Sequence, residues 1–180
     1  RSGIAWELLA PDGPDSYLHR FLDGVNGPGL HHIAMQVRDM DSALRSMAQF
    51  GIEPWGLDQQ ERHFEDEQPV ENEVEGGAHS VAYIHPRGGG FGFLYQLYEG
   101  TPWHLPEPFE DDRPDTLGII GVNSLGHAHH SRTELGDWYE QLFGFRTVHA
   151  PPLAFARASF VSRILELPSE QLQIEVMQPA

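Results

Sequence analysis

The chain has 180 residues, which is enough to bury one core or two small cores that pack against each other. Its 27 acidic residues against 11 basic ones, all Arg, disfavour nucleic-acid and membrane partners and exclude a Schiff-base lysine or a P-loop. With no Cys and no apolar run long enough to span a bilayer, we expect a soluble, cytoplasmic protein that acts on a small-molecule substrate, and any metal must be bound by His, carboxylate or amide groups.

Residues 1–27 are predicted to form one strand and a linker. Trp6 to Pro11 (WELLAP) matches the pattern of Ile174 to Pro179 (IEVMQP), so it resembles the last strand of a unit whose beginning is absent. Gly, Pro and Asp are frequent in residues 11–29, which indicates a surface connection with a short helix around Ser16 to Leu22. We therefore consider that the chain is a fragment of a longer protein, or that its units pair in a permuted order.

Residues 28–100 begin with a strand and a helix. Leu30 to Val37 has the β-branched and apolar residues of a strand. Asp39 and Asp41 are suitable helix caps, the apolar residues that follow have helical spacing, and Gly51 is suited to end the helix.

Two further strands are predicted in the same unit. They are Ser80 to His85 and Phe93 to Tyr98, joined by the turn Pro86 to Gly90. Residues 58–75 carry eight carboxylates with little periodicity, which favours a solvated acidic loop over an active-site lid.

Residues 101–116 are a Pro-rich acidic linker, and residues 117–180 repeat the earlier order of elements. Ser124 to His130 forms the strand, and Ser131 with Glu134 makes a capping box for a helix that ends at Gly144. The strands that follow are predicted at Ala158 to Leu167 and Gln171 to Met177. Each unit therefore has a strand, a helix and then two or three strands.

These motifs resemble a known superfamily. Residues 3–100 are similar to methylmalonyl-CoA epimerase-like members of the vicinal oxygen chelate superfamily, which includes glyoxalases, bleomycin resistance proteins and extradiol dioxygenases. Residues 125–178 look like a first half of the same superfamily. The resemblance rests on Trp6 to Gly13, Gly29 to Ala34 (GLHHIA), Gly77 to His79, His85 to Arg87, Leu94 to Leu97, Trp138 with Tyr139, and Leu142 to Phe145.

The resemblance implies an α+β fold in which paired βαβββ half-modules form a curved mixed β-sheet with helices on the outside. The unit at 28–100 looks like a second half and the unit at 117–180 like a first half, which reverses the order in the family. A half-module alone would expose an apolar sheet face. We therefore expect pairing with another half-module, in the same chain or across a homodimer.

The resemblance also implies a divalent-metal site with ligands on the first and last strands of each unit. By position these are His32, Gln96, His127 and Glu175, with His129 as the second choice after His127. Imidazole and carboxylate or amide oxygens suit Zn, Fe, Co, Ni or Mn. The candidate catalytic bases are Glu175 and Glu7, because the amide of Gln96 does not accept a proton near neutral pH.

Three functions are compatible with this reading. The first is a metal-dependent epimerase, isomerase or lyase, in which a metal-chelated substrate loses a proton from carbon. The second is an extradiol-type Fe(II) dioxygenase, which uses two His and one carboxylate. The third is a non-catalytic module that binds a hydrophobic ligand between aromatic walls, with candidate wall residues Trp6, Trp55, Phe91, Phe93, Tyr95 and Trp103.

Overall fold

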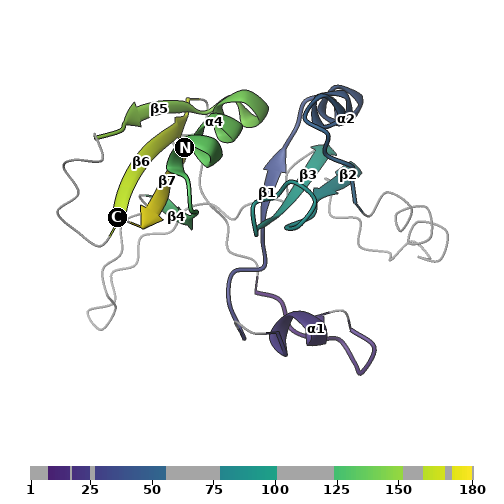
Figure 1. Ribbon diagram of the computed structural model, residues 1–180. Helices are drawn as coiled ribbons and strands as arrows, with labels where there is room; N and C mark the ends of the chain where they lie inside the picture. The colour runs from purple at the N-terminus through teal and green to yellow at the C-terminus, as the bar shows by residue number, and fades with distance from the viewer. Residues whose placement is uncertain are drawn as a thin grey trace, which may run out of the picture. The chain divides into compact units, whose positions relative to one another are not determined.

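The computed structural model describes two compact units. One comprises residues 5–106, and the other comprises residues 107–180 together with residues 1–4. Within them, the residues whose structure is described are 8–16, 18–24, 27–55, 78–100, 124–151, 160–168 and 172–179. Each unit has its own mixed sheet and its own helix against that sheet (Figure 1).

The unit of residues 5–106 has a three-stranded sheet in the order β1-β3-β2. Strand β1 (His32–Gln36) is parallel to β3 (Leu94–Gly100), and β2 (Ala78–Ile84) is antiparallel to β3. Helix α1 (Leu18–Leu22) precedes the sheet, and α2 (Met40–Gln49) follows β1. Trp55 pairs with Tyr83 in an isolated antiparallel bridge at the edge of β2.

Helix α2 begins and ends where its sequence indicates, and it covers one face of the sheet. The Asp39 carboxylate accepts a hydrogen bond from the Ser42 backbone N–H at 2.6 Å, which caps the first turn. Gly51, just after the helix, has φ of +67°, a left-handed conformation that favours glycine. The residues buried between helix and sheet include Met40, Met47, Ala82, Ile84, Tyr95 and Leu97.

The other unit has the complete order of a βαβββ module. Its elements are β4 (Ser124–Ala128), α4 (Arg132–Phe143), β5 (Arg146–His149), β6 (Phe160–Leu167) and β7 (Leu172–Pro179). The strands are ordered β4-β7-β6-β5, with β4 parallel to β7 and the other pairs antiparallel.

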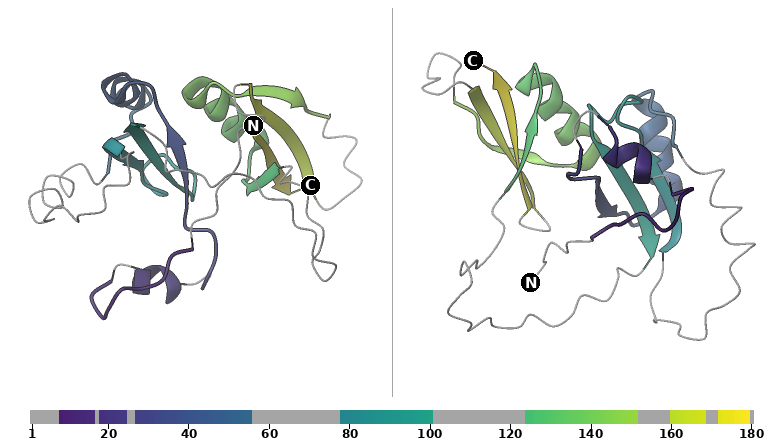
Figure 2. Two further views of the ribbon diagram at one scale, coloured as in Figure 1. Left: turned by 180° about the vertical axis from the view of Figure 1, so that it is seen from behind. Right: turned by 90° about the horizontal axis from the view of Figure 1, so that it is seen from below.

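Helix α4 packs on one face of this second sheet, mainly against β6 and β7 (Figure 2). The Ser131 hydroxyl accepts from the Glu134 backbone N–H at 3.2 Å, which is one half of the predicted capping box, whereas the Ser131 N–H donates to His129 Nδ1. Gly144 ends the helix with φ of +73°. The side chains buried beneath α4 include Leu135, Trp138, Tyr139, Phe145, Leu165, Ile174 and Val176.

The predicted α+β class and the βαβββ order are confirmed, whereas the predicted leading strand differs. Residues 8–11 have no strand pairing, and Leu8 is 94% exposed. Glu7, the alternative base, lies outside the described residues, as do the acidic stretch 58–75 and the linker 101–116. In the part of the chain that is described, no helix is long and apolar enough to cross a membrane.

Arg163 of β6 ties its sheet to α4. Its guanidinium donates to the Asp137 carboxylate at 2.7 Å and pairs with the Glu140 carboxylate at 2.9 Å, while the Arg163 side chain is only 12% exposed. Gly136 makes room for it, because a Cβ at that position would lie 2.6 Å from an Arg163 nitrogen. The Thr147 hydroxyl also donates to Glu140, at 2.6 Å, so the Glu140 carboxylate joins the helix to both β5 and β6.

We expect Glu140→Gln to lower stability in a pH-dependent way. The Thr147 hydroxyl, and then the Thr147 amide and Arg163, hold the pKa of Glu140 below its ordinary value of 4.5. The stabilisation is therefore present above that value and is lost as pH falls through the lower folded-state pKa. Urea unfolding at about pH 7 should show a loss on the order of 1 kcal/mol that shrinks towards about pH 3.5. The exposed Glu134→Gln variant is the control, and a pH-independent loss would contradict this explanation.

Candidate metal centre

His32 and Gln96 lie on the same face of the β1-β3-β2 sheet. The parallel register pairs His32 with Leu94 and Ala34 with Gln96. Because alternate residues of a strand point to the same side, both side chains point away from the face that carries buried Tyr95. We call this the open face, since among the described elements α2 packs only on the other one. Both side chains are half-buried. The structure brings these two predicted ligands together because they lie on one face of adjacent strands.

The ring of His31 contacts the ring of His32. Their Nδ1 atoms are 3.0 Å apart, and the Phe21 ring packs edge-on against His31 with centroids 4.8 Å apart. Strict alternation would place adjacent strand residues on opposite sides, but β1 begins at His32, so His31 is outside the strand. If His32 donates its Nδ1 proton to His31, its Nε2 keeps the lone pair that a metal ligand needs.

The two units can be aligned through their helix starts. The N-cap residues are Asp39 and Ser131. Two residues before each cap, a backbone N–H donates to the last strand at 2.8 Å, from Val37 to Tyr98 and from His129 to Met177. The strands β1 and β4 also have the same length and the same pattern of burial. The first strands of the two units are therefore equivalent residue by residue.

This equivalence assigns Ser124, rather than a histidine, to the position of His32. Ser124 precedes its N-cap residue by seven positions, as His32 does. Glu175 pairs with Gly126 two residues further along β4, which is the position that Gln96 has opposite Ala34. The open face of the second sheet thus carries Ser124 and Glu175.

His127 lies on the opposite face from Glu175, which differs from the prediction that both bind one metal. It pairs with the fully buried Val176, and its Nδ1 is 3.0 Å from the Tyr139 hydroxyl of α4. His129 lies just after β4, and its Nδ1 accepts from the Ser131 backbone N–H at 3.1 Å at the start of α4. His127 therefore does not share the face of Glu175, because the strand-to-helix spacing sets the register of β4, and His129 lies beyond the end of that strand.

Each open face therefore carries two candidate donors. They are an imidazole and an amide in one unit, and a hydroxyl and a half-buried carboxylate in the other. Within the ranges that the structure describes, no group of three or more His, Asp or Glu side chains is close enough to bind a metal. Imidazole, carboxylate and amide oxygen are each groups that bind divalent ions such as Zn, Fe, Co, Ni or Mn.

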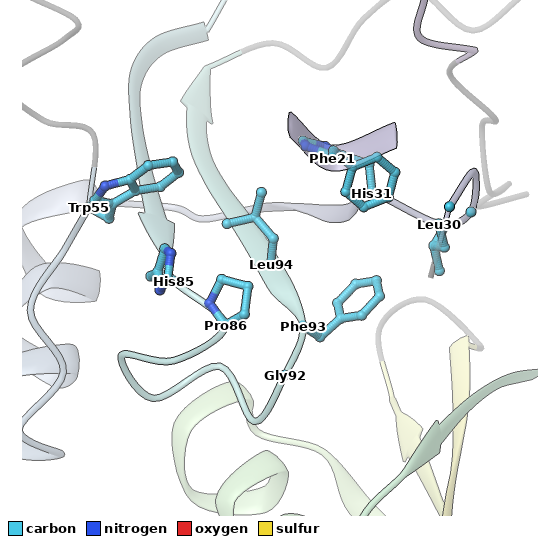
Figure 3. Close-up of a pocket in the computed structure, with 11 residues that line it drawn as sticks. Phe21, Leu30, His31, Trp55, His85, Pro86, Gly92, Phe93 and Leu94 are labelled. Atoms are coloured by element: carbon cyan, nitrogen blue, oxygen red, sulfur yellow. The ribbon is translucent and has the colours of Figure 1, made fainter. Parts of the chain in front are cut away.

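A cavity of about 450 Å³ lies in the unit of residues 5–106, and its lining includes His31 and Leu94, the chain neighbour and the register partner of His32. In Figure 3, Trp55 and His85 lie on one side of it and Phe93 and His31 on the other, with Leu94 between them. Leu94 is the register partner of His32 and shares its face, so the cavity adjoins the candidate metal ligand. The remaining lining residues are Phe21, Gly27, Gly29, Leu30, Pro86 and Gly92.

Comparison with known proteins supports the superfamily that the motifs indicate. Residues 1–68 match the family model of the Glyoxalase/Bleomycin resistance protein/Dioxygenase superfamily. A mutant of 4-hydroxymandelate synthase from Streptomyces coelicolor has a similar fold, with a TM-score of 0.53 and 12% identity over 93% of this chain. This chain covers 46% of that protein's length.

A second solved structure has a lower TM-score. A mutant of the fosfomycin resistance protein FosX from Listeria monocytogenes, in complex with Mn(II) and a dihydroxypropylphosphonic acid, has a TM-score of 0.40 and 13% identity; the match covers 84% of this chain and 92% of FosX. No curated protein sequence matches this chain. The particular substrate and reaction therefore have to be argued from the residues themselves.

Proposed function

We propose that the chain is a divalent-metal-dependent epimerase, isomerase or lyase of the glyoxalase-like superfamily. The observation that supports it is the shared open face of His32 and Gln96 beside an aromatic cavity. Glu175 has the position equivalent to Gln96 and adds the carboxylate. The proposal keeps His32, Gln96 and Glu175 as metal ligands and replaces His127 by Ser124 in the fourth position.

The residues of the proposed ligand set have different roles in metal binding and in proton transfer. His32, Gln96 and Glu175 would hold the divalent ion, which would stabilise the negative charge that develops on the substrate. Gln96 can coordinate or orient a water through its carbonyl oxygen but cannot accept a proton. Glu175 is then the group that accepts a proton from the substrate carbon and returns it. Glu7 remains the alternative base of the prediction.

The proposal requires two half-modules. His32 and Gln96 alone provide only one imidazole and one amide, which is too few for a firmly bound ion. The open face of a second half-module has to supply the rest, either within the chain or across a homodimer.

A non-catalytic binding module is the second candidate. It is favoured by Ser124, because a neutral hydroxyl is a poorer metal ligand than an imidazole. A facial set of two His and one carboxylate, as an extradiol-type Fe(II) dioxygenase uses, would need an imidazole at this same position. The arrangement therefore favours the dioxygenase less than the other two functions.

Deuterium exchange tests the catalytic proposal directly. Protein loaded in turn with Zn, Co, Ni and Mn is incubated in heavy water with small 2-hydroxyketones and 2-substituted malonates, and deuterium at carbon is measured by mass spectrometry. We expect incorporation above that of chelator-treated protein, and a decrease on the order of 100-fold or more in Glu175→Gln. Metal-loaded protein that gives no exchange above the chelated control would overturn the proposal and favour the binding module.

A further inference from the structure

The cavity beside His32 has rigid aromatic walls. Trp55 is 48% exposed, yet its ring is fixed edge-on against Tyr83 and against His85, with centroids 6.0 and 5.2 Å apart. Its backbone is held as well, because Trp55 and Tyr83 exchange two backbone hydrogen bonds of 2.9 and 3.1 Å. On the other side, Phe93 packs edge-on against buried Tyr95 with centroids 5.5 Å apart. Such fixed rings provide contact area with little loss of conformational entropy on binding.

The described residues that line the cavity are mostly apolar or aromatic. Among the residues that the structure describes, no Asp, Glu or Arg lines the cavity, although the chain carries a net charge of −16. We therefore expect the part of a ligand that lies inside the cavity to be apolar. The cavity volume of about 450 Å³ is in the range of small-molecule sites. A charged group inside would lose hydration without gaining an ion pair.

His85 provides a directional polar contact. Its Nδ1 accepts a hydrogen bond from the Arg87 backbone N–H at 3.1 Å, so the neutral ring carries its proton on Nε2. Nε2–H is then a donor for an oxygen of the ligand. His32 lies beside Leu94 of the same cavity, so a ligand whose ring occupies the cavity has its next atoms near the proposed metal.

We propose that this cavity binds the ring of an aromatic substrate whose oxygen-bearing end extends to His32. The substrate class is then a small aromatic 2-hydroxy or 2-oxo acid or ketone. The placement of the oxygen-bearing end rests on the proposed metal function, whereas binding of the ring rests on the cavity alone.

Three probes separate these two parts: 3-phenyllactate has the ring and the chelating end, benzyl alcohol has the ring alone, and lactate has the chelating end alone. Affinities are measured by calorimetry and saturation-transfer NMR on the full chain, metal-free and metal-loaded. We expect phenyllactate to bind at least about tenfold more tightly than lactate in both forms, and more tightly when metal is present.

Two variants test whether the aromatic ring of the ligand binds in the cavity. Trp55→Ala and Phe93→Ala should each weaken phenyllactate and benzyl alcohol by about tenfold and leave lactate unchanged. Phe160→Ala is the matched control, because Phe160 is 40% exposed in the other unit. Circular dichroism checks that each variant is folded, and the two cavity variants change different walls.

The outcomes distinguish this inference from the proposed function. One outcome is that binding depends on the ring, is lost in the cavity variants and does not change when metal is added. This result supports the aromatic cavity and contradicts the metal proposal. A second outcome is that deuterium exchange depends on metal while lactate binds as tightly as phenyllactate. This result overturns the aromatic inference and supports the metal proposal. Equal phenyllactate affinity in native, Trp55→Ala and Phe93→Ala protein also overturns the aromatic inference.

Discussion

Replacing His32 by Ala is expected to remove most of the affinity for a divalent metal. His32 is the one imidazole that we assign to the proposed ligand set, and His31 orients it through the 3.0 Å contact between their Nδ1 atoms. Because even outer-shell partners of a ligand change metal affinity by about 10- to 100-fold, we expect a loss of at least about 100-fold. Competition with a chelating dye measures this affinity.

His127→Ala is the matched control for that variant. It also removes one imidazole from the first strand of a unit, but His127 contacts the Tyr139 hydroxyl under α4 rather than the open face. We expect unchanged metal affinity and a loss of about 1 kcal/mol in the free energy of unfolding. A large loss of metal in His127→Ala, with little change in His32→Ala, would contradict the assignment of faces.

Ser124→His is expected to tighten metal binding. This substitution places an imidazole at the position equivalent to His32, on the face that carries Glu175. An imidazole is a far better ligand than a neutral hydroxyl, so the affinity should rise by about tenfold or more.

Thr133→His controls for the addition of an imidazole, because Thr133 is exposed on α4. An equal gain in Thr133→His would mean that the added histidine binds metal adventitiously. No gain in Ser124→His would contradict the equivalence of the two units.

The elements could be predicted because their signals are local. Asp39 and Ser131 cap their helices through their own side chains, and Gly51 and Gly144 have the left-handed conformations that end them. The internal repeat follows from the recurrence of these caps. The positions of the other strands were predicted to within a few residues, because the β-branched and apolar residues of the core occur mainly there, whereas the exposed edge strand β5 was not predicted.

The side of the sheet that each site residue occupies was harder to predict. A shift of one residue reverses the face of every side chain in a strand. The sequence contains the deciding signal, because Ser124 and His32 are equally distant from their N-cap residues, but the prediction aligned the histidines instead. Trp55 and Phe93 were among the predicted aromatic wall residues and line the cavity, whereas its other walls could not be predicted, since α1, Trp55 and the turn before β3 meet only in the folded unit.

The most direct test of the proposed site is to count the imidazole nitrogens bound to the metal. Electron spin echo envelope modulation of protein loaded with substoichiometric Cu(II) detects coordinated imidazole. The proposal predicts one imidazole in native protein, none in His32→Ala, one in His127→Ala and two in Ser124→His. Two coordinated imidazoles in native protein, or a signal that persists in His32→Ala and disappears in His127→Ala, would contradict it.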